Sequence, residues 1–168
     1  MSTVTFKGSP VTITGDMPAL GSQAPDFVLT AADLSDVRLA DLKGTKLLLN
    51  IFPSIDTEVC AASVRRFHEA ASAQPNLILL AISADLPFAH KRFCAAEGID
   101  RVRTLSTFRA PGFGADYGVL ISSAPLAGLL TRAVLVLDPQ HRVIYTQRVA
   151  EIAQEPDYAA ALQACTAD

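Results

Sequence analysis

The chain has 168 residues, of which 50% are hydrophobic and 18% charged, with a net charge of −3 from 14 basic and 17 acidic residues. This composition excludes a disordered chain, which combines low hydrophobicity with high charge, and it lacks the excess of Lys and Arg typical of nucleic-acid binding. The apolar runs are far shorter than the ~18 residues of a membrane span, and the N-terminus lacks the basic and apolar stretches of an export signal. We therefore expect a single cytoplasmic domain over residues 1–168, with neither membrane nor nucleic acid as partner.

The apolar pattern predicts strands and helices in a defined order. β-Branched and aromatic residues on both sides of a Gly–Ser–Pro turn predict a hairpin over about residues 3–14. Several later strands are continuous apolar runs, which indicates that both of their faces are covered, as in a parallel sheet. The expected strands are residues 4–6, 11–13, 27–30, 47–52, 77–82, 133–137 and 143–149. The expected helices begin near residue 56 and end near 74, run from 88 to 97 before Gly98, and run from 157 to 165 after Pro156.

This order of elements predicts an α/β layer sandwich. Strand, helix, strand and helix are followed by a β-hairpin and a final helix, around a central mixed sheet. The arrangement matches a thioredoxin-like fold with an added N-terminal β-hairpin. Periodicity alone does not settle which strands run parallel.

The cysteines are Cys60, Cys94 and Cys165. No two are close enough for a C-x-x-C pair, and none neighbours a His at metal-ligand spacing. An odd number in a chain without an export signal argues against a structural disulfide framework. The simplest interpretation of each is a small buried apolar side chain, and we expect no metal and no cofactor.

The surroundings of Cys60 favour a different interpretation for that residue. A buried strand ends at Phe52, a short loop carries Pro53, and a helix opens around Asp56 or Thr57, either of which can be its N-cap. Cys60 then lies within the first turn, where free N–H groups and the positive end of the helix dipole favour a thiolate over a thiol. Thr57, three residues earlier, lies on the same side of this turn, so its hydroxyl can hydrogen-bond the sulfur.

This segment resembles the peroxiredoxins. Pro53, Thr57 and Cys60 reproduce their P-x-x-x-T-x-x-C signature, and the longer string around it is similar to the bacterial thiol peroxidase branch, the atypical two-cysteine type. The matching segments are residues 50–65, 86–89, 92–94, 104–109 and 132–134. The resemblance extends from the N-terminal hairpin to the last helix, so it covers nearly the whole chain.

The resemblance implies a role for each matching residue. Cys60 corresponds to the peroxidatic cysteine, Thr57 to its hydroxyl partner and Pro53 to the residue that shields the pocket. Arg132 corresponds to the arginine that stabilises thiolate and peroxide, and Cys94 to the resolving cysteine. In such enzymes the thiolate attacks a peroxide and becomes a sulfenic acid, which the second cysteine converts to an intramolecular disulfide. The resemblance further implies hydrogen peroxide and organic hydroperoxides as substrates, thioredoxin as reductant, antioxidant defence as the role, and a homodimer.

The residues outside the signature can also be interpreted one by one from their types and positions in the sequence. Arg132 just precedes a buried strand, so its fixed charge can point across the end of the sheet toward Cys60. Cys165 has no partner and is expected to pack. Glu58 stands where this branch often carries Gly, and its carboxylate opposes the charge pattern that activates a thiolate. Arg109 either lines the pocket or pairs with an acid. The histidines, which are His68, His90 and His141, are expected to have structural or solvent roles.

Two other classes of function compete with a peroxidase. A thioredoxin-like disulfide oxidoreductase normally uses C-x-x-C, which this chain lacks. A redox sensor or binding module would use a Cys60–Cys94 switch without turnover. Peroxide turnover, insulin reduction and disulfide formation without either activity distinguish the three.

Overall fold

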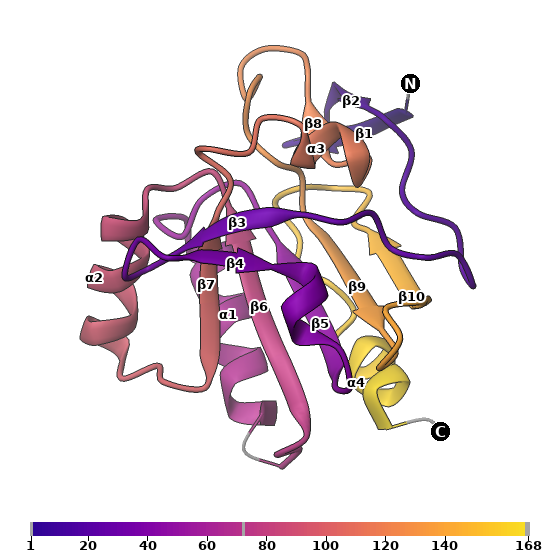
Figure 1. The fold of residues 1–168 in the computed structure, drawn as a ribbon. Helices are drawn as coiled ribbons and strands as arrows, with labels where there is room; N and C mark the ends of the chain where they lie inside the picture. Colours follow the sequence, from indigo (N-terminus) through magenta and orange to yellow (C-terminus); the bar gives the residue numbers. More distant parts are fainter. Residues whose placement is uncertain (1, 72, 167–168) are drawn as a thin grey trace.

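A seven-stranded mixed sheet forms the centre of the molecule, for which the computed structural model describes residues 2–71 and 73–166 (Figure 1). Its strands are β3 (Val28–Ala31), β4 (Asp36–Arg38), β5 (Lys46–Ile51), β6 (Leu77–Ser83), β7 (Val102–Ser106), β9 (Ala133–Leu137) and β10 (Val143–Arg148). They lie in the order β10-β9-β5-β6-β7-β3-β4. The three strands β5, β6 and β7 are parallel to one another, and the other neighbours are antiparallel. The predicted α/β class with a central mixed sheet is confirmed.

Both faces of this sheet are covered, which explains the continuous apolar runs of its central strands. The helices are α1 (Glu58–Ala71), α2 (Pro87–Glu97), α3 (Phe113–Asp116) and α4 (Tyr158–Thr166), with a 3-10 helix η1 (Leu39–Leu42). Alternate residues of β5 and β9, such as Leu48 and Val134, pack with α1, α2 and α4. The residues between them, such as Leu49 and Leu135, pack with η1 and α3 on the other face. Side chains that alternate along a strand therefore enter two separate cores.

The N-terminal hairpin belongs to a second, smaller sheet. β1 (Ser2–Phe6) pairs with β2 (Ser9–Thr14), and β2 pairs with β8 (Leu120–Ile121), all antiparallel. The two-residue turn is Lys7–Gly8, and both residues have positive φ, which suits the twist of a hairpin. Thr5 also bridges in parallel to Glu151, which follows β10. The hairpin was predicted from the sequence, whereas its strand partners were not.

The apolar pattern of the sequence predicts the longer elements but not several short ones. The strands predicted between 27 and 149 lie within one or two residues of those observed, and α2 ends at Gly98 in the left-handed conformation as expected. The prediction missed β4, β7, β8, α3 and η1. β7 reads VRTLS, which is too short and too polar for a continuous apolar run. α4 starts at Tyr158, because Asp157 caps it by accepting the N–H of Ala160.

The topology brings three segments together at one end of the sheet. β5 is antiparallel to β9, with Ile51 opposite Ala133, so the loop that follows β5 meets the residue that precedes β9. β5 is parallel to β6, with Ile51 opposite Ile82, so the loops after both strands also lie side by side. The residues at this end include Cys60, Arg132 and Asp85. Within the described part of the chain, no helix is long and apolar enough to cross a membrane.

Candidate active site

Cys60 is the third residue of α1, and its side chain is completely buried at the carboxyl end of β5. Its first helical turn is fixed to the sheet through Ser63, which donates to the Cys60 carbonyl at 2.7 Å. Asn50 of β5 in turn donates to the Ser63 hydroxyl at 3.0 Å. The sulfur is therefore placed by a chain of buried hydrogen bonds that joins α1 to β5.

Arg132 provides the charge beside this sulfur. Its Nη2 lies 3.3 Å from the Sγ of Cys60, and its Nε donates to the carbonyl of Ile152 at 2.9 Å. The residue is only 2% exposed, so the guanidinium acts in a medium of low dielectric constant, where charge–charge attraction is strong. Its Nη1 has no partner among the described residues. The arginine can therefore stabilise a thiolate with one nitrogen and still offer a donor to a substrate oxygen.

Thr57 is the N-cap of α1, since its carbonyl accepts the N–H of Ala61 at 2.9 Å. Its hydroxyl donates to the carbonyl of Ser54 at 3.0 Å. From the sequence, this hydroxyl was expected to hydrogen-bond the sulfur of Cys60. Because a hydroxyl has one proton and Thr57 gives it to Ser54, only the lone pairs of the Thr57 oxygen remain available, as acceptors. Asp56, the other candidate cap, is exposed and pairs with Arg92 of α2 at 2.8 Å. Pro53 is buried directly after β5.

Cys94 lies on α2, where it is half-buried and a free thiol. Burial raises the pKa of this thiol, against a smaller opposite effect of its hydrogen bond with Thr104 of β7. Cys60 instead contacts Arg132 at the start of β9. β5 and β6 lie between β9 and β7 in the sheet. The two sulfurs thus have separate partners, one just before β9 and one on β7, and these two strands are not neighbours.

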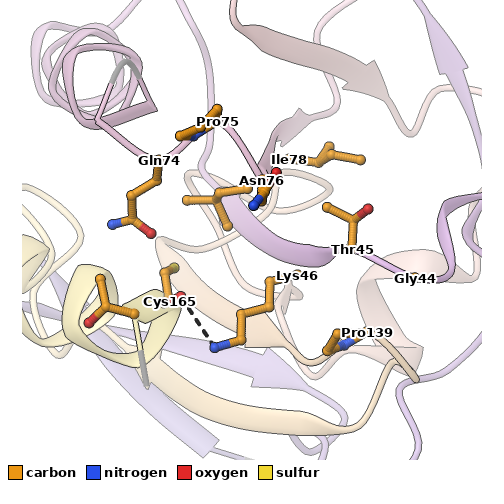
Figure 2. A pocket seen from close by; sticks show the side chains of 11 residues that line it. Gly44, Thr45, Lys46, Gln74, Pro75, Asn76, Ile78, Pro139 and Cys165 are labelled. Atoms are coloured by element: carbon orange, nitrogen blue, oxygen red, sulfur yellow. Dashed lines mark hydrogen bonds between the residues drawn. The ribbon is translucent and has the colours of Figure 1, made fainter. Parts of the chain in front are cut away.

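Cys165 lies far from this site, in a pocket at the opposite end of β5 (Figure 2). The pocket is also lined by Lys46, the first residue of β5, whose ammonium donates to the Cys165 carbonyl at 3.3 Å. Burial raises the pKa of the Cys165 thiol to about 11. A thiol in this environment is a weak nucleophile at neutral pH, which agrees with the packing role expected from the sequence.

The sequence interpretation overlooked a carboxylate next to the Cys60 loop. Asp85, two residues after β6, accepts hydrogen bonds from the Ile55 N–H at 2.7 Å and the Ser54 hydroxyl at 2.8 Å. His90 of α2 is completely buried beside it. A signal was present, because Ser83 and Asp85 are polar residues at the carboxyl end of a buried strand, where sites of α/β proteins gather.

The other residues singled out in the sequence lie outside the site. Arg109 pairs with an acid, since its Nη2 is 3.7 Å from the Asp36 carboxylate. His68 contacts Asp100 at 3.2 Å, and Glu58 is exposed at the first position of α1. In the described part of the chain, no group of three or more His, Cys, Asp or Glu residues could hold a metal ion. The chemistry that this arrangement supports is that of a thiolate held by an arginine.

Comparisons with known proteins agree with this chemistry. The Redoxin family model matches residues 19–162. Proteins described as "Thiol peroxidase" from Mycobacterium bovis and Mycobacterium tuberculosis are 51% identical over 164 residues, covering 98% of this chain and 98% of each relative.

Solved structures show the same relationship. A peroxiredoxin-like protein from Aquifex aeolicus superposes with a TM-score of 0.91 at 36% identity, covering 97% of this chain and 95% of that one. A thiol peroxidase from Chromobacterium violaceum gives a TM-score of 0.89 at 27% identity, with coverage of 95% and 93%. The chain therefore belongs to the Redoxin family and is an oxidoreductase of the peroxiredoxin type.

Proposed function

We propose that this enzyme reduces hydrogen peroxide and organic hydroperoxides with Cys60 as the peroxidatic cysteine, as part of antioxidant defence. The Cys60 thiolate attacks one peroxide oxygen, the O–O bond breaks, and water or an alcohol leaves after taking up a proton. The sulfur becomes a sulfenic acid. Cys94 then attacks this sulfur, which forms the Cys60–Cys94 disulfide and releases water. An external dithiol, proposed to be thioredoxin, reduces the disulfide and is itself oxidised.

One contact supports this proposal above all others, the 3.3 Å between Arg132 Nη2 and Cys60 Sγ. A permanent cation favours the thiolate and stabilises the negative charge that develops on the peroxide. The buried, unpartnered Nη1 is a donor for a peroxide oxygen. Thr57 and Pro53 are proposed to complete the pocket, Thr57 by accepting a hydrogen bond from the peroxide O–H and Pro53 by excluding water. Because Cys60 has no exposed surface, small movements of these neighbours have to admit the substrate.

The proposed disulfide requires a conformational change. A disulfide needs Cα atoms within about 7 Å of each other, whereas the two sulfurs have separate partners, Arg132 just before β9 and Thr104 on β7. We expect the first turn of α1 and the helix α2 to loosen after oxidation. Amide hydrogen exchange in both segments then rises in the oxidised enzyme.

A coupled assay tests the proposed function directly. NADPH oxidation is followed with thioredoxin, thioredoxin reductase and hydrogen peroxide or an alkyl hydroperoxide. We expect turnover by the wild type, none by Cys60→Ser, and no cycling through the disulfide by Cys94→Ser. Insulin reduction without peroxide turnover would indicate a disulfide oxidoreductase instead. Disulfide formation without either activity would indicate a redox sensor.

We also propose that the enzyme is a cytoplasmic homodimer. Large apolar side chains are exposed at the start of α2 and in the loop after β7: Leu86, Phe88 and Phe108 are 52%, 65% and 45% exposed. Apolar groups gathered on one side of a protein favour a protein interface. Light scattering after gel filtration should give the mass of a dimer, and Phe88→Glu should shift it toward the monomer. A wild-type monomer at micromolar concentration would contradict the proposal.

A further inference from the structure

The carboxylate of Asp85 fixes the loop that precedes Cys60. Its Oδ2 accepts the Ile55 N–H at 2.7 Å, and its Oδ1 accepts the Ser54 hydroxyl at 2.8 Å. The side chain is 12% exposed. Burial alone would raise the pKa of Asp85, but the neighbouring His90 and hydrogen bonds from Ser83, Ile55 and Ser54 lower it to about 2. The group is therefore an anion at neutral pH, and charge-assisted bonds of this kind are the stronger ones.

Ser54 passes this constraint on to the N-cap of the catalytic helix. Its carbonyl accepts both the N–H and the hydroxyl of Thr57, at 3.2 and 3.0 Å. Its hydroxyl oxygen also accepts the N–H of Asp56 at 3.2 Å. Asp85 thus determines where Ser54 lies, and Ser54 determines how Thr57 caps the turn that carries Cys60.

The same carboxylate is joined to the helix that carries Cys94. Ser83 donates to Asp85 Oδ2 at 2.6 Å and lies 2.8 Å from Nε2 of His90, a fully buried residue of α2. Since Ser83 has one hydroxyl proton and gives it to Asp85, Nε2 of His90 is the donor to Ser83. The Ser106 hydroxyl of β7 donates to the Asp85 carbonyl. Asp85 therefore connects the Cys60 loop with α2 through buried groups.

Besides apolar packing, the described residues of the two cysteine-bearing regions are also joined by ion pairs, and these are exposed. Asp56 pairs with Arg92 at 2.8 Å, with side chains 60% and 65% exposed. Arg65 pairs with Glu97 at 3.4 Å, with side chains 46% and 36% exposed. Pairs in water contribute little, because solvent screens them and two long side chains lose freedom. The buried Asp85 cluster is the stronger connection.

We propose that Asp85 is a positioning residue that favours the peroxide-reactive conformation over the disulfide-forming one. The inference rests on the proposed function and adds a residue to it. While the cluster is intact, Thr57 and the first turn of α1 are held for the attack on peroxide. The disulfide forms only after this loop and α2 separate. Loss of the carboxylate therefore slows the first step and accelerates the second.

The rates of Cys60 oxidation and disulfide formation are expected to change in opposite directions. This result distinguishes a residue that positions the loop from one that only limits the access of peroxide to Cys60. A loop that merely opened wider would admit peroxide faster and would raise both rates. A general loss of structure would lower both. Only a group that orders the first step and restrains the second lowers one rate and raises the other.

The test is Asp85→Asn, with Asp138→Asn as the matched control. Asp138 is also a half-buried aspartate that accepts backbone N–H groups, in the turn at the far end of β9. Cys60 oxidation by hydrogen peroxide is measured in a Cys94→Ser background, and disulfide formation in the presence of Cys94, both by rapid quench, alkylation and mass spectrometry. We expect Asp85→Asn to slow oxidation and to accelerate disulfide formation, each about fivefold, as for one hydrogen bond. The control should change neither rate.

A second variant, and a measurement that does not depend on catalysis, also test the role of Asp85. Ser54→Ala removes only the relay and should show the same signs with smaller changes. In the reduced protein, Asp85→Asn should increase amide exchange at Ile55 and Thr57, which does not depend on catalysis. Rates that shift together, or that stay within twofold of the wild type with unchanged exchange, would overturn the inference. Wild-type Cys60 that does not react with peroxide would overturn the proposed function instead, while the exchange result would still decide the role of Asp85.

Discussion

Arg132 shows at the scale of single residues why a permanent, forked cation suits this site. One guanidinium donates to the Ile152 carbonyl, contacts the Cys60 sulfur and keeps a third nitrogen, Nη1, without a partner among the described residues. Lysine would place a single ammonium at the end of a flexible chain and could not hold all three directions. The geometry, and not the charge alone, distinguishes the two side chains.

Arg132→Lys should therefore lower the rate constant of Cys60 oxidation by about 10- to 100-fold, the equivalent of one or two hydrogen bonds to a charged group. The chain has no Trp, so peroxide consumption and rapid-quench mass spectrometry are better readouts than intrinsic fluorescence. Arg109→Lys, which changes an arginine away from the site, is the control. A wild-type rate in Arg132→Lys would remove this residue from the reaction.

The ionisation of Asp85 makes a prediction for acid stability. Its pKa is about 2 in the folded protein, against 3.8 as the ordinary value. A lowered pKa contributes stability that is complete above the ordinary value and disappears as the pH falls through about 2. The contribution is roughly 2 kcal/mol. Urea unfolding between pH 5 and 2 should give a shallower loss of stability for Asp85→Asn than for the wild type. Parallel curves would show that the carboxylate has no such role.

Cys165 should be silent in catalysis. Its thiol is buried and its pKa is raised to about 11, so the thiolate is scarce at neutral pH. Cys165→Ser is expected to keep wild-type turnover, and Cys165 should resist iodoacetamide at pH 8 in the folded enzyme. A disulfide between Cys60 and Cys165 after one equivalent of peroxide would show that the resolving cysteine was misassigned.

At the scale of elements, the N-terminal hairpin supports the arginine. The Glu151 carboxylate accepts the N–H groups of Lys7 and Gly8 at the hairpin turn, together with the Thr5 hydroxyl and the Ala153 N–H. These hydrogen bonds lower the pKa of Glu151 to about 2. Ile152, held between them by its N–H bond to the Thr5 carbonyl, presents the carbonyl that orients Arg132. The hairpin is thus joined to the site through one loop.

Glu151→Ala should lower the rate of Cys60 oxidation about 3- to 10-fold, since the Ile152 carbonyl loses its support. Glu151→Gln keeps one acceptor oxygen and should recover part of the rate. Glu69→Ala, which removes an exposed carboxylate on α1, is the control. If Glu151→Ala lowered thermal stability without changing this rate, the hairpin would stabilise the fold and leave Arg132 unaffected.

The strands also show which elements the apolar pattern of the sequence can predict and which it cannot. Continuous apolar runs such as Leu77–Ile82 indicate a buried strand, because they have the length of a strand and are too short for a typical buried helix. β4 has three residues and β8 two, and such strands exist only because a neighbour pairs with them. β9 has the same apolar signature as β5 and β6 but is antiparallel to β5, because coverage on both faces, not strand direction, produces the run.

At the scale of the whole molecule, the sequence predicted Cys60, the proposed nucleophile, and the arginine beside it, but not the groups that hold these two residues in place. Pro53, Thr57 and Cys60 are close in sequence, so their proximity follows from local spacing. The Asp85 cluster joins residues from 54 to 106, and the support of Arg132 comes from Ile152. Such contacts depend on strand order, which periodicity does not provide. The hydroxyl of Thr57 shows a local limit as well, because spacing placed it on the side of the sulfur, whereas its partner is the Ser54 carbonyl three residues earlier.

In the proposed reaction, peroxide oxidises Cys60 and Cys94 then bonds to it. The most direct measurement is peptide mass spectrometry after one equivalent of hydrogen peroxide, with dimedone present to trap sulfenic acid. We expect a Cys60–Cys94 disulfide in the wild type, a dimedone adduct on Cys60 in Cys94→Ser, and unmodified Cys165 in both. Oxidation that starts at Cys94, or a Cys60→Ser variant that still consumes peroxide, would contradict the proposed reaction.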